Sequence, residues 1–153
     1  MPFRDVFGHR RLIGLLARSV ARHSLPPSLV FAGPSGVGKR LTATALAQSL
    51  NCLQPVAWSP AGALSTEAAL RGQKPRARSP LPDARRLEPG VAADACGACA
   101  ACSRIARGVH PDVLVLEPGE NGSIRVEAGR DAIERSVYRP FEGRRRVVIV
   151  DGA

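Results

Sequence analysis

The chain has 153 residues, 44% of them apolar, which is enough for one globular domain with its own core but few for two independent domains. Its apolar runs fall far short of the about 20 residues that a membrane-spanning helix needs, and its amino terminus lacks a secretory signal, so we expect a cytoplasmic protein with no membrane partner. The 22 basic and 13 acidic residues give a net charge of +9, which attracts nucleic acid but is equally typical of a solvated basic surface.

The first half of the chain predicts a helix, a strand, a glycine loop and a second helix. Leucine and valine recur at helical spacing over residues 11–23, with arginines on the opposite face. Residues 28–32 predict a short buried strand, and residues 37–50 a helix rich in Ala and Leu. Residues 53–95 carry prolines and scattered arginines without periodicity, so we interpret them as a flexible insertion.

The second half predicts further strands and helices in alternation. We expect a helix over residues 99–107, a strand over 112–116, a turn at 119–122 and a helix over 126–138. Residues 146–151 predict a further strand, whose continuous apolar run at 147–150 is typical of a strand buried on both faces in a parallel sheet. Alternating strands and helices indicate an α/β fold.

A phosphate-binding loop is predicted between the first strand and the second helix, where the sequence matches G-x-x-x-x-G-K. Its backbone N–H groups and the helix amino terminus face phosphate oxygens, and Lys39 reaches the outer phosphates. An acidic residue at the end of an apolar strand, Asp151, is the Walker B candidate. The candidate nucleotide-binding residues are therefore Gly33, Pro34, Ser35, Gly36, Val37, Gly38, Lys39, Arg40 and Asp151.

Two departures weaken this site as a hydrolytic centre. Arg40 stands where a Ser or Thr hydroxyl would bind Mg²⁺, and Thr42 cannot replace it because two helical steps rotate it by about 200°. Gly152 stands where ATPases of this pattern carry a Glu that polarises water. We expect weak or vestigial ATP binding, doubtful magnesium binding and no catalytic residue, so whether the chain is an enzyme stays open.

Four cysteines predict a metal site. Cys96, Cys99 and Cys102 have the spacing C-x2-C-x2-C, and Cys52 is the only other cysteine. Four thiolates complete a tetrahedral zinc shell, and disulfides are disfavoured in a cytoplasmic chain. An iron–sulfur cluster and unliganded buried thiols remain alternatives.

These motifs, in this order, resemble the amino-terminal ATPase module of bacterial clamp-loader subunits of DNA polymerase III. The resemblance rests on Phe7-Gly8-His9, GPSGVGK, Asn51-Cys52, CGACAACSRIARGVHPDV and RRRVVIVDGA, and it covers nearly the whole chain except residues 53–95. Within the family the chain is most similar to the delta prime members. The gamma/tau members usually have a Thr after the loop lysine and an Asp-Glu pair, from which Arg40 and Gly152 depart.

The resemblance implies an AAA+ P-loop three-layer parallel sheet, here incomplete, with a small zinc-binding insertion that uses four cysteines. It divides the chain into residues 1–52 with the phosphate loop, the insertion 53–95, a zinc module 96–110 and a second core part 111–153. It also implies a role in loading the sliding clamp on primed DNA. The implied partners are the gamma/tau and delta subunits, the clamp, and primer-template DNA through the assembled complex.

In this family a strand that comes later in the sequence lies between the phosphate-loop strand and the Walker B strand. That strand, the arginine finger, the lid and the collar would lie after residue 153. We therefore expect a gap or a non-native pairing between residues 29–32 and 147–150, and marginal stability of the isolated chain. Two other functions stay open: an autonomous P-loop kinase or NTPase, and a zinc-stapled nucleic-acid-binding module.

Overall fold

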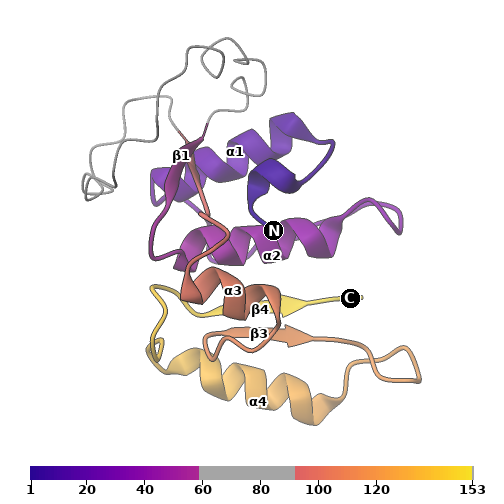
Figure 1. Cartoon of the computed structure of the whole chain (residues 1–153). Helices are drawn as coiled ribbons and strands as arrows, with labels where there is room; N and C mark the ends of the chain where they lie inside the picture. Colours follow the sequence, from indigo (N-terminus) through magenta and orange to yellow (C-terminus); the bar gives the residue numbers. More distant parts are fainter. Residues whose placement is uncertain (59–91, 153) are drawn as a thin grey trace, which may run out of the picture.

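The computed structural model describes residues 1–58 and 92–152 (Figure 1). The four predicted helices are confirmed, with ends that differ by at most two residues from those expected. The elements in chain order are η1 (Phe3–Asp5), α1 (Arg10–Ala21), α2 (Lys39–Asn51), β1 (Val56–Trp58), β2 (Ala92–Asp94), α3 (Ala100–Ala106), β3 (Val113–Leu116), α4 (Val126–Val137) and β4 (Val147–Val150).

The parallel sheet contains two strands in the described part of the chain. β3 and β4 pair in parallel, with Val113 opposite Val147 and Leu116 opposite Val150. The turn expected before α4 is also present, since Gly122 N donates to Gly119 O at 2.9 Å. Residues 1–58 and 92–152 thus form a mixed α/β structure that contains a parallel pair, and they do not show the full three-layer sheet.

The strand predicted over residues 28–32 is wrong, because this segment belongs to neither sheet. Its backbone has no strand beside it among the described residues, and Val30 is 92% exposed although its apolar neighbours suggested a buried position. A strand needs a partner for its N–H and C=O groups, whatever its side chains. Residues 29–32 and 147–150 are therefore not paired with each other, so the non-native pairing that was one of the two expectations is not formed.

The ends of the supposed flexible insertion are ordered, which corrects the interpretation of residues 53–95. β1 and β2 form an antiparallel pair in which Val56 lies opposite Asp94 and Trp58 opposite Ala92. All three residues of β2 are buried. Two runs of three residues are too short to show a period, so sequence patterns could not reveal them. The remainder of the predicted insertion, residues 59–91, lies outside the described residues.

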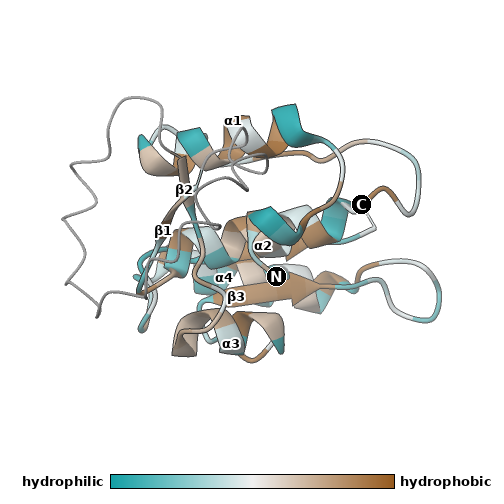
Figure 2. Cartoon of the chain, turned by 45° about the horizontal axis from the view of Figure 1, so that its top comes forward, coloured by the Kyte–Doolittle hydropathy of each residue, from teal (hydrophilic) through white to brown (hydrophobic). Residues whose placement is uncertain are grey.

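Helix α2 lies between two hydrophobic clusters. On one side Ala45 and Leu46 pack with α1, η1 and β2. On the other side Ala47 packs with Ile105 of α3 and with Ile149 of β4. Figure 2 shows the corresponding pattern: β3 is hydrophobic along its length, whereas α1 alternates between hydrophobic and hydrophilic around its turns. Within the two described stretches, none of the helices combines the length and the apolar character needed to cross a membrane.

Candidate functional site

The phosphate loop leads directly into α2, as predicted. Gly36 and Gly38 have φ values of 81° and 85°, which favour glycine, and Gly38 caps the helix. The side chain of Lys39 folds back over the loop, where its Nζ donates to Gly33 O at 2.8 Å and to Pro34 O at 3.0 Å. The exposed loop is thus held closed by its own lysine.

Arg40 contacts both acidic residues that follow the parallel strands. Its guanidinium pairs with Glu117, which comes directly after β3, and with Asp151 Oδ2 at 3.4 Å, directly after β4. The structure therefore places Arg40 beside Asp151, and both are candidate nucleotide-binding residues from the sequence, although a direct contact between them was not predicted. Glu117 was missed, although its position one residue after a predicted strand was a signal.

The residues around the loop do not fit a magnesium ion. Mg²⁺ requires free oxygen ligands in octahedral geometry, yet the carboxylates of Glu117 and Asp151 already face the Arg40 guanidinium. Thr42 does not supply the missing hydroxyl, because its residue is buried and its Oγ1 is turned back toward Gly38 O, to which it donates at 2.9 Å within the helix. In this arrangement neither the carboxylates nor Thr42 offers Mg²⁺ a free oxygen ligand beside the loop.

The four cysteines converge at the other end of α2. Their Sγ atoms all lie within 4.8 Å of one another, and Cys52 Sγ is 4.0 Å from Cys99 Sγ. A tetrahedral zinc ion with Zn–S bonds of about 2.3 Å needs sulfur atoms about 3.8 Å apart. Gly97, with φ 80°, makes the turn that brings Cys96 and Cys99 to the same side. The arrangement therefore fits a zinc ion.

Backbone and thiol donors favour the thiolate form of Cys52 within this cluster. Cys96 N donates to Cys52 Sγ at 3.2 Å, and Cys99 N donates to Cys96 Sγ at 3.3 Å. The Cys102 thiol, acting as a donor, lowers the pKa of Cys52 to about 5 despite burial, and the same contact raises the pKa of Cys102. A metal ion binds thiolates, so an ion held by these sulfur atoms would replace the protons of the thiols.

The amino-terminal segment supports one side of the cysteine cluster. The guanidinium of Arg4 donates to Ala95 O and Cys96 O, each at 2.8 Å. The fully buried carboxylate of Asp94 accepts hydrogen bonds from Phe3 N at 2.8 Å and Arg4 N at 3.1 Å. These contacts fix the backbone immediately before the first cysteine of the triplet.

Helix α2 supports the other side through Gln48. This side chain is fully buried, and its Nε2 donates to Cys102 O at 2.8 Å. Its Oε1 accepts a hydrogen bond from the Met1 ammonium at 2.9 Å. The side-chain amide of Gln48 in α2 therefore links the amino terminus to α3.

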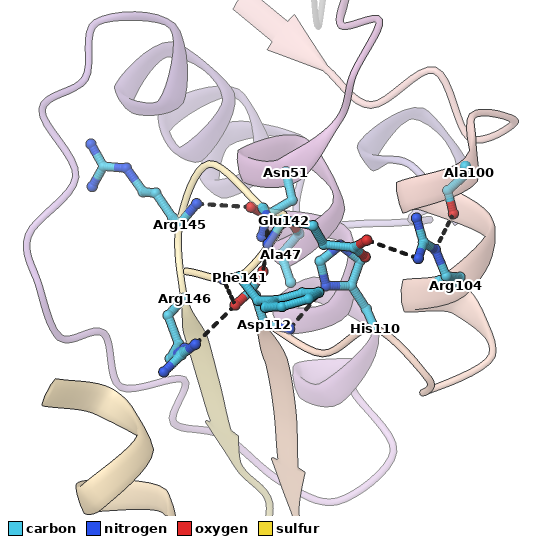
Figure 3. Close-up of polar contacts among 11 residues, drawn as sticks. Ala47, Asn51, Ala100, Arg104, His110, Asp112, Phe141, Glu142, Arg145 and Arg146 are labelled. Atoms are coloured by element: carbon cyan, nitrogen blue, oxygen red, sulfur yellow. Dashed lines mark hydrogen bonds and ion pairs between the residues drawn. The ribbon is translucent and has the colours of Figure 1, made fainter. Parts of the chain in front are cut away.

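A second buried carboxylate, Asp112, organises the loop before β4 (Figure 3). It accepts hydrogen bonds from Phe141 N at 2.6 Å, Glu142 N at 2.9 Å and Gly143 N at 2.7 Å, and pairs with Arg146 Nη2 at 3.1 Å. Burial alone would raise the pKa of Asp112, but these three N–H donors and the guanidinium outweigh it and hold the pKa well below its usual range.

Asn51 and His110 extend this network toward the cysteines. Arg145 N donates to Asn51 Oδ1 at 2.9 Å, while the Arg145 side chain points away (Figure 3). Asp112 N donates to His110 Nδ1 at 3.1 Å, and His110 Nε2 lies 3.5 Å from Glu142 Oε1. Residues 108–113 end one of the segments on which the resemblance rests, but their polar side chains had no predicted role, because the partners of Asp112 lie about thirty residues later in the chain.

Comparison with known proteins gives a consistent result. A sequence model of the family described as "DNA polymerase III, delta subunit" matches residues 85–153. The chain is similar to DNA polymerase III subunit delta' of Pseudomonas aeruginosa, with 33% identity over 122 residues, 79% of this chain and 26% of that protein. It is also similar to DNA polymerase III subunit tau of Escherichia coli, with 26% identity over 149 residues, 97% of this chain and 17% of that protein.

A third relative is DNA polymerase III subunit gamma/tau of Mycobacterium tuberculosis, with 27% identity over 153 residues, 99% of this chain and 20% of that protein. The chain thus spans about a quarter or less of the length of these curated relatives. The similarity extends across the phosphate loop, the cysteine cluster and β4.

Proposed function

We propose that the chain is a clamp-loader-type subunit of DNA polymerase III, and that it acts as a delta prime-like subunit that helps to load the sliding clamp on primed DNA. Residues 1–52 and 111–153 form parts of its AAA+ core, around the zinc module 96–110. Its partners are the gamma/tau and delta subunits, the clamp, and primer-template DNA reached through the assembled complex. It works in the cytoplasm.

One observation favours a delta prime-like subunit over an active ATPase subunit: Arg40 is paired with Asp151. A motor subunit needs a metal ion at this point between the loop and the Walker B strand, and a base after the acidic residue. Here a guanidinium faces the acidic residue and Gly152 follows it. The nucleotide site is therefore degenerate, and zinc on Cys52, Cys96, Cys99 and Cys102 is structural.

Reconstitution tests the assignment. The full chain, mixed with the gamma/tau and delta subunits of the same organism, should co-elute with them and support clamp loading on primed DNA. Fast ATP hydrolysis by the chain alone would identify an autonomous NTPase instead. Salt-sensitive DNA binding by the chain alone, without assembly, would identify a zinc-stapled nucleic-acid-binding module.

The nucleotide site is tested by titrating the chain with labelled ATP. Binding should be weak and should be lost in the Lys39→Ala variant, since Lys39 is the loop cation nearest the phosphate position. Circular dichroism of the variant controls for folding. Binding that survives this substitution would place the nucleotide elsewhere.

A further inference from the structure

We propose that Arg40 is a built-in cation of the phosphate loop, which takes the place of a divalent metal ion and makes polyphosphate binding independent of magnesium. This inference rests on the proposed nucleotide site, and it concerns how that site balances charge. It depends on the residues after β3 and β4 as well as on the loop.

Two carboxylates that follow neighbouring strands lie beside the guanidinium of Arg40. β3 and β4 run parallel, so the residues that follow them, Glu117 and Asp151, emerge at the same edge of the sheet. The contact is reinforced by the backbone, because Asp151 N donates to Leu116 O at 2.9 Å. Arg40, the second residue of α2, reaches both carboxylates from the loop side.

Four charged side chains at the loop balance one another without any ligand. Arg40 and Lys39 supply two positive charges, and Glu117 and Asp151 supply two negative ones. A guanidinium stays charged at all physiological pH values, and its planar fork suits carboxylate and phosphate oxygens alike. A polyphosphate therefore competes with the two carboxylates for Arg40, and Mg²⁺ finds neither carboxylate free.

This arrangement reverses the effect that removing an acidic side chain is expected to have on the affinity for nucleotide. In a metal-dependent site, loss of the Walker B carboxylate weakens nucleotide binding, because the metal loses a ligand. Here Asp151→Asn or Glu117→Gln releases Arg40 toward phosphate and removes negative charge near it. Each substitution should therefore strengthen ATP binding, by about two- to fivefold for exposed ion pairs of this kind.

The decisive experiment titrates ATP into the full chain and its variants, with EDTA and with Mg²⁺. For the unmodified chain the affinity should be nearly the same in both. Arg40→Thr should bind ATP poorly in EDTA and recover several-fold with Mg²⁺, because the new hydroxyl and the freed carboxylates offer oxygen ligands. Arg130→Thr is the matched control: it removes the same charge from an exposed position of α4 that takes part in no ion pair among the described residues, and it should leave the magnesium response unchanged.

Two results would overturn the inference: ATP binding by the unmodified chain that strengthens more than about tenfold with Mg²⁺, or weaker binding by Asp151→Asn. A measurement without nucleotide separates this inference from the proposed function. Mg²⁺ alone should raise the melting midpoint of Arg40→Thr, whose carboxylates face each other unpaired, but not that of the unmodified chain. If ATP binds to none of the variants, the nucleotide site of the proposed function is refuted, and the magnesium-dependent melting still decides the role of Arg40.

Discussion

Single residues with buried polar groups hold the loops of this molecule in place. Asp112 has no exposed side-chain surface, yet it stays charged because four donors converge on it. Removing one partner of such a group leaves the others unsatisfied in an apolar setting, which is the costly case for a buried charge. The loop that leads into β4 therefore depends on one carboxylate.

Asp112→Asn should lower the free energy of unfolding by about 3 kcal/mol at neutral pH. The amide keeps one acceptor oxygen but turns a donor toward the backbone N–H groups. The difference from the unmodified chain should also depend on pH in a defined direction. Because the folded-state pKa of Asp112 is lowered, its contribution is complete above the unfolded value of about 3.9 and is lost as pH falls through the folded value.

Urea denaturation of both proteins at a series of pH values checks this prediction. The difference in unfolding free energy should be constant from pH 8 to about pH 5 and should shrink only below about pH 4. A difference that closes near neutral pH would show that another group is responsible.

Gly143→Ala should destabilise the same loop by about 1–3 kcal/mol. A Cβ atom at this position would lie 2.7 Å from Asn51 Oδ1 and 3.1 Å from Asp112 Oδ2, so both buried side chains would have to move. Gly129→Ala is the matched control, because a Cβ there meets nothing within 4 Å in the middle of α4. That control should be stabilising by up to about 1 kcal/mol, and equal effects of the two substitutions in thermal denaturation would contradict the assignment.

At the scale of elements, α2 is the common support of two sites at its opposite ends. Lys39 and Arg40 begin the helix, and Cys52 caps its end. The cysteine end also anchors η1 and β2 through Arg4 and Asp94. Metal bound by the cysteines should therefore stabilise elements that contain none of its ligands.

Purification under reducing conditions should yield one zinc per chain, and chelation should lower the melting midpoint, because structural zinc binds with about 10 kcal/mol or more. Chelation should also accelerate hydrogen exchange at the Phe3 amide, which donates to Asp94. Cys96→Ser should mimic chelation, whereas Ser103→Ala, a neighbour in α3, should retain full zinc. Substoichiometric zinc in protein that remains folded would count against the site.

Sequence patterns predicted the elements whose hydrophobic periodicity extends over several turns and the motifs whose residues lie close together in the chain. The amphipathic helices needed only their own residues, and the cysteine triplet was evident from its spacing. Residues 28–32 failed because pairing is a property of two segments, and their apolar pattern says nothing about whether a partner is beside them. Glu117 and Asp112 were missed for the same reason, since their roles come from partners distant in the sequence.

The whole molecule leaves apolar backbone edges open within its described residues. Val30 is 92% exposed, and on β4 Val148 and Val150 are 37% and 50% exposed. Unpaired N–H and C=O groups beside exposed apolar side chains promote pairing between copies of a chain. The isolated 153-residue chain should therefore be marginally stable, with a melting midpoint below about 45 °C.

Val30→Lys should slow aggregation in a light-scattering assay and leave the unfolding free energy within about 0.5 kcal/mol of the original, since the valine is exposed. Val109→Lys is the control: Val109 is 61% exposed but lies in the turn after α3, away from the open edges. Equal protection by both substitutions would attribute the effect to net charge alone, and a cooperative monomer with a midpoint of about 45 to 65 °C would refute the marginal stability.

The bond between the amino-terminal segment and Asp94 has a consequence for the order of events on the ribosome. Phe3 N finds its acceptor 91 residues further along the chain, and Arg145 N finds Asn51 at a separation of 94. Neither contact exists until the later partner has been synthesised. Folding is slow when a chain must lose the entropy of closing such long loops before the contacts between their ends can stabilise it. Phe3 and Arg4 must therefore wait for the synthesis of Asp94 before they reach their final position.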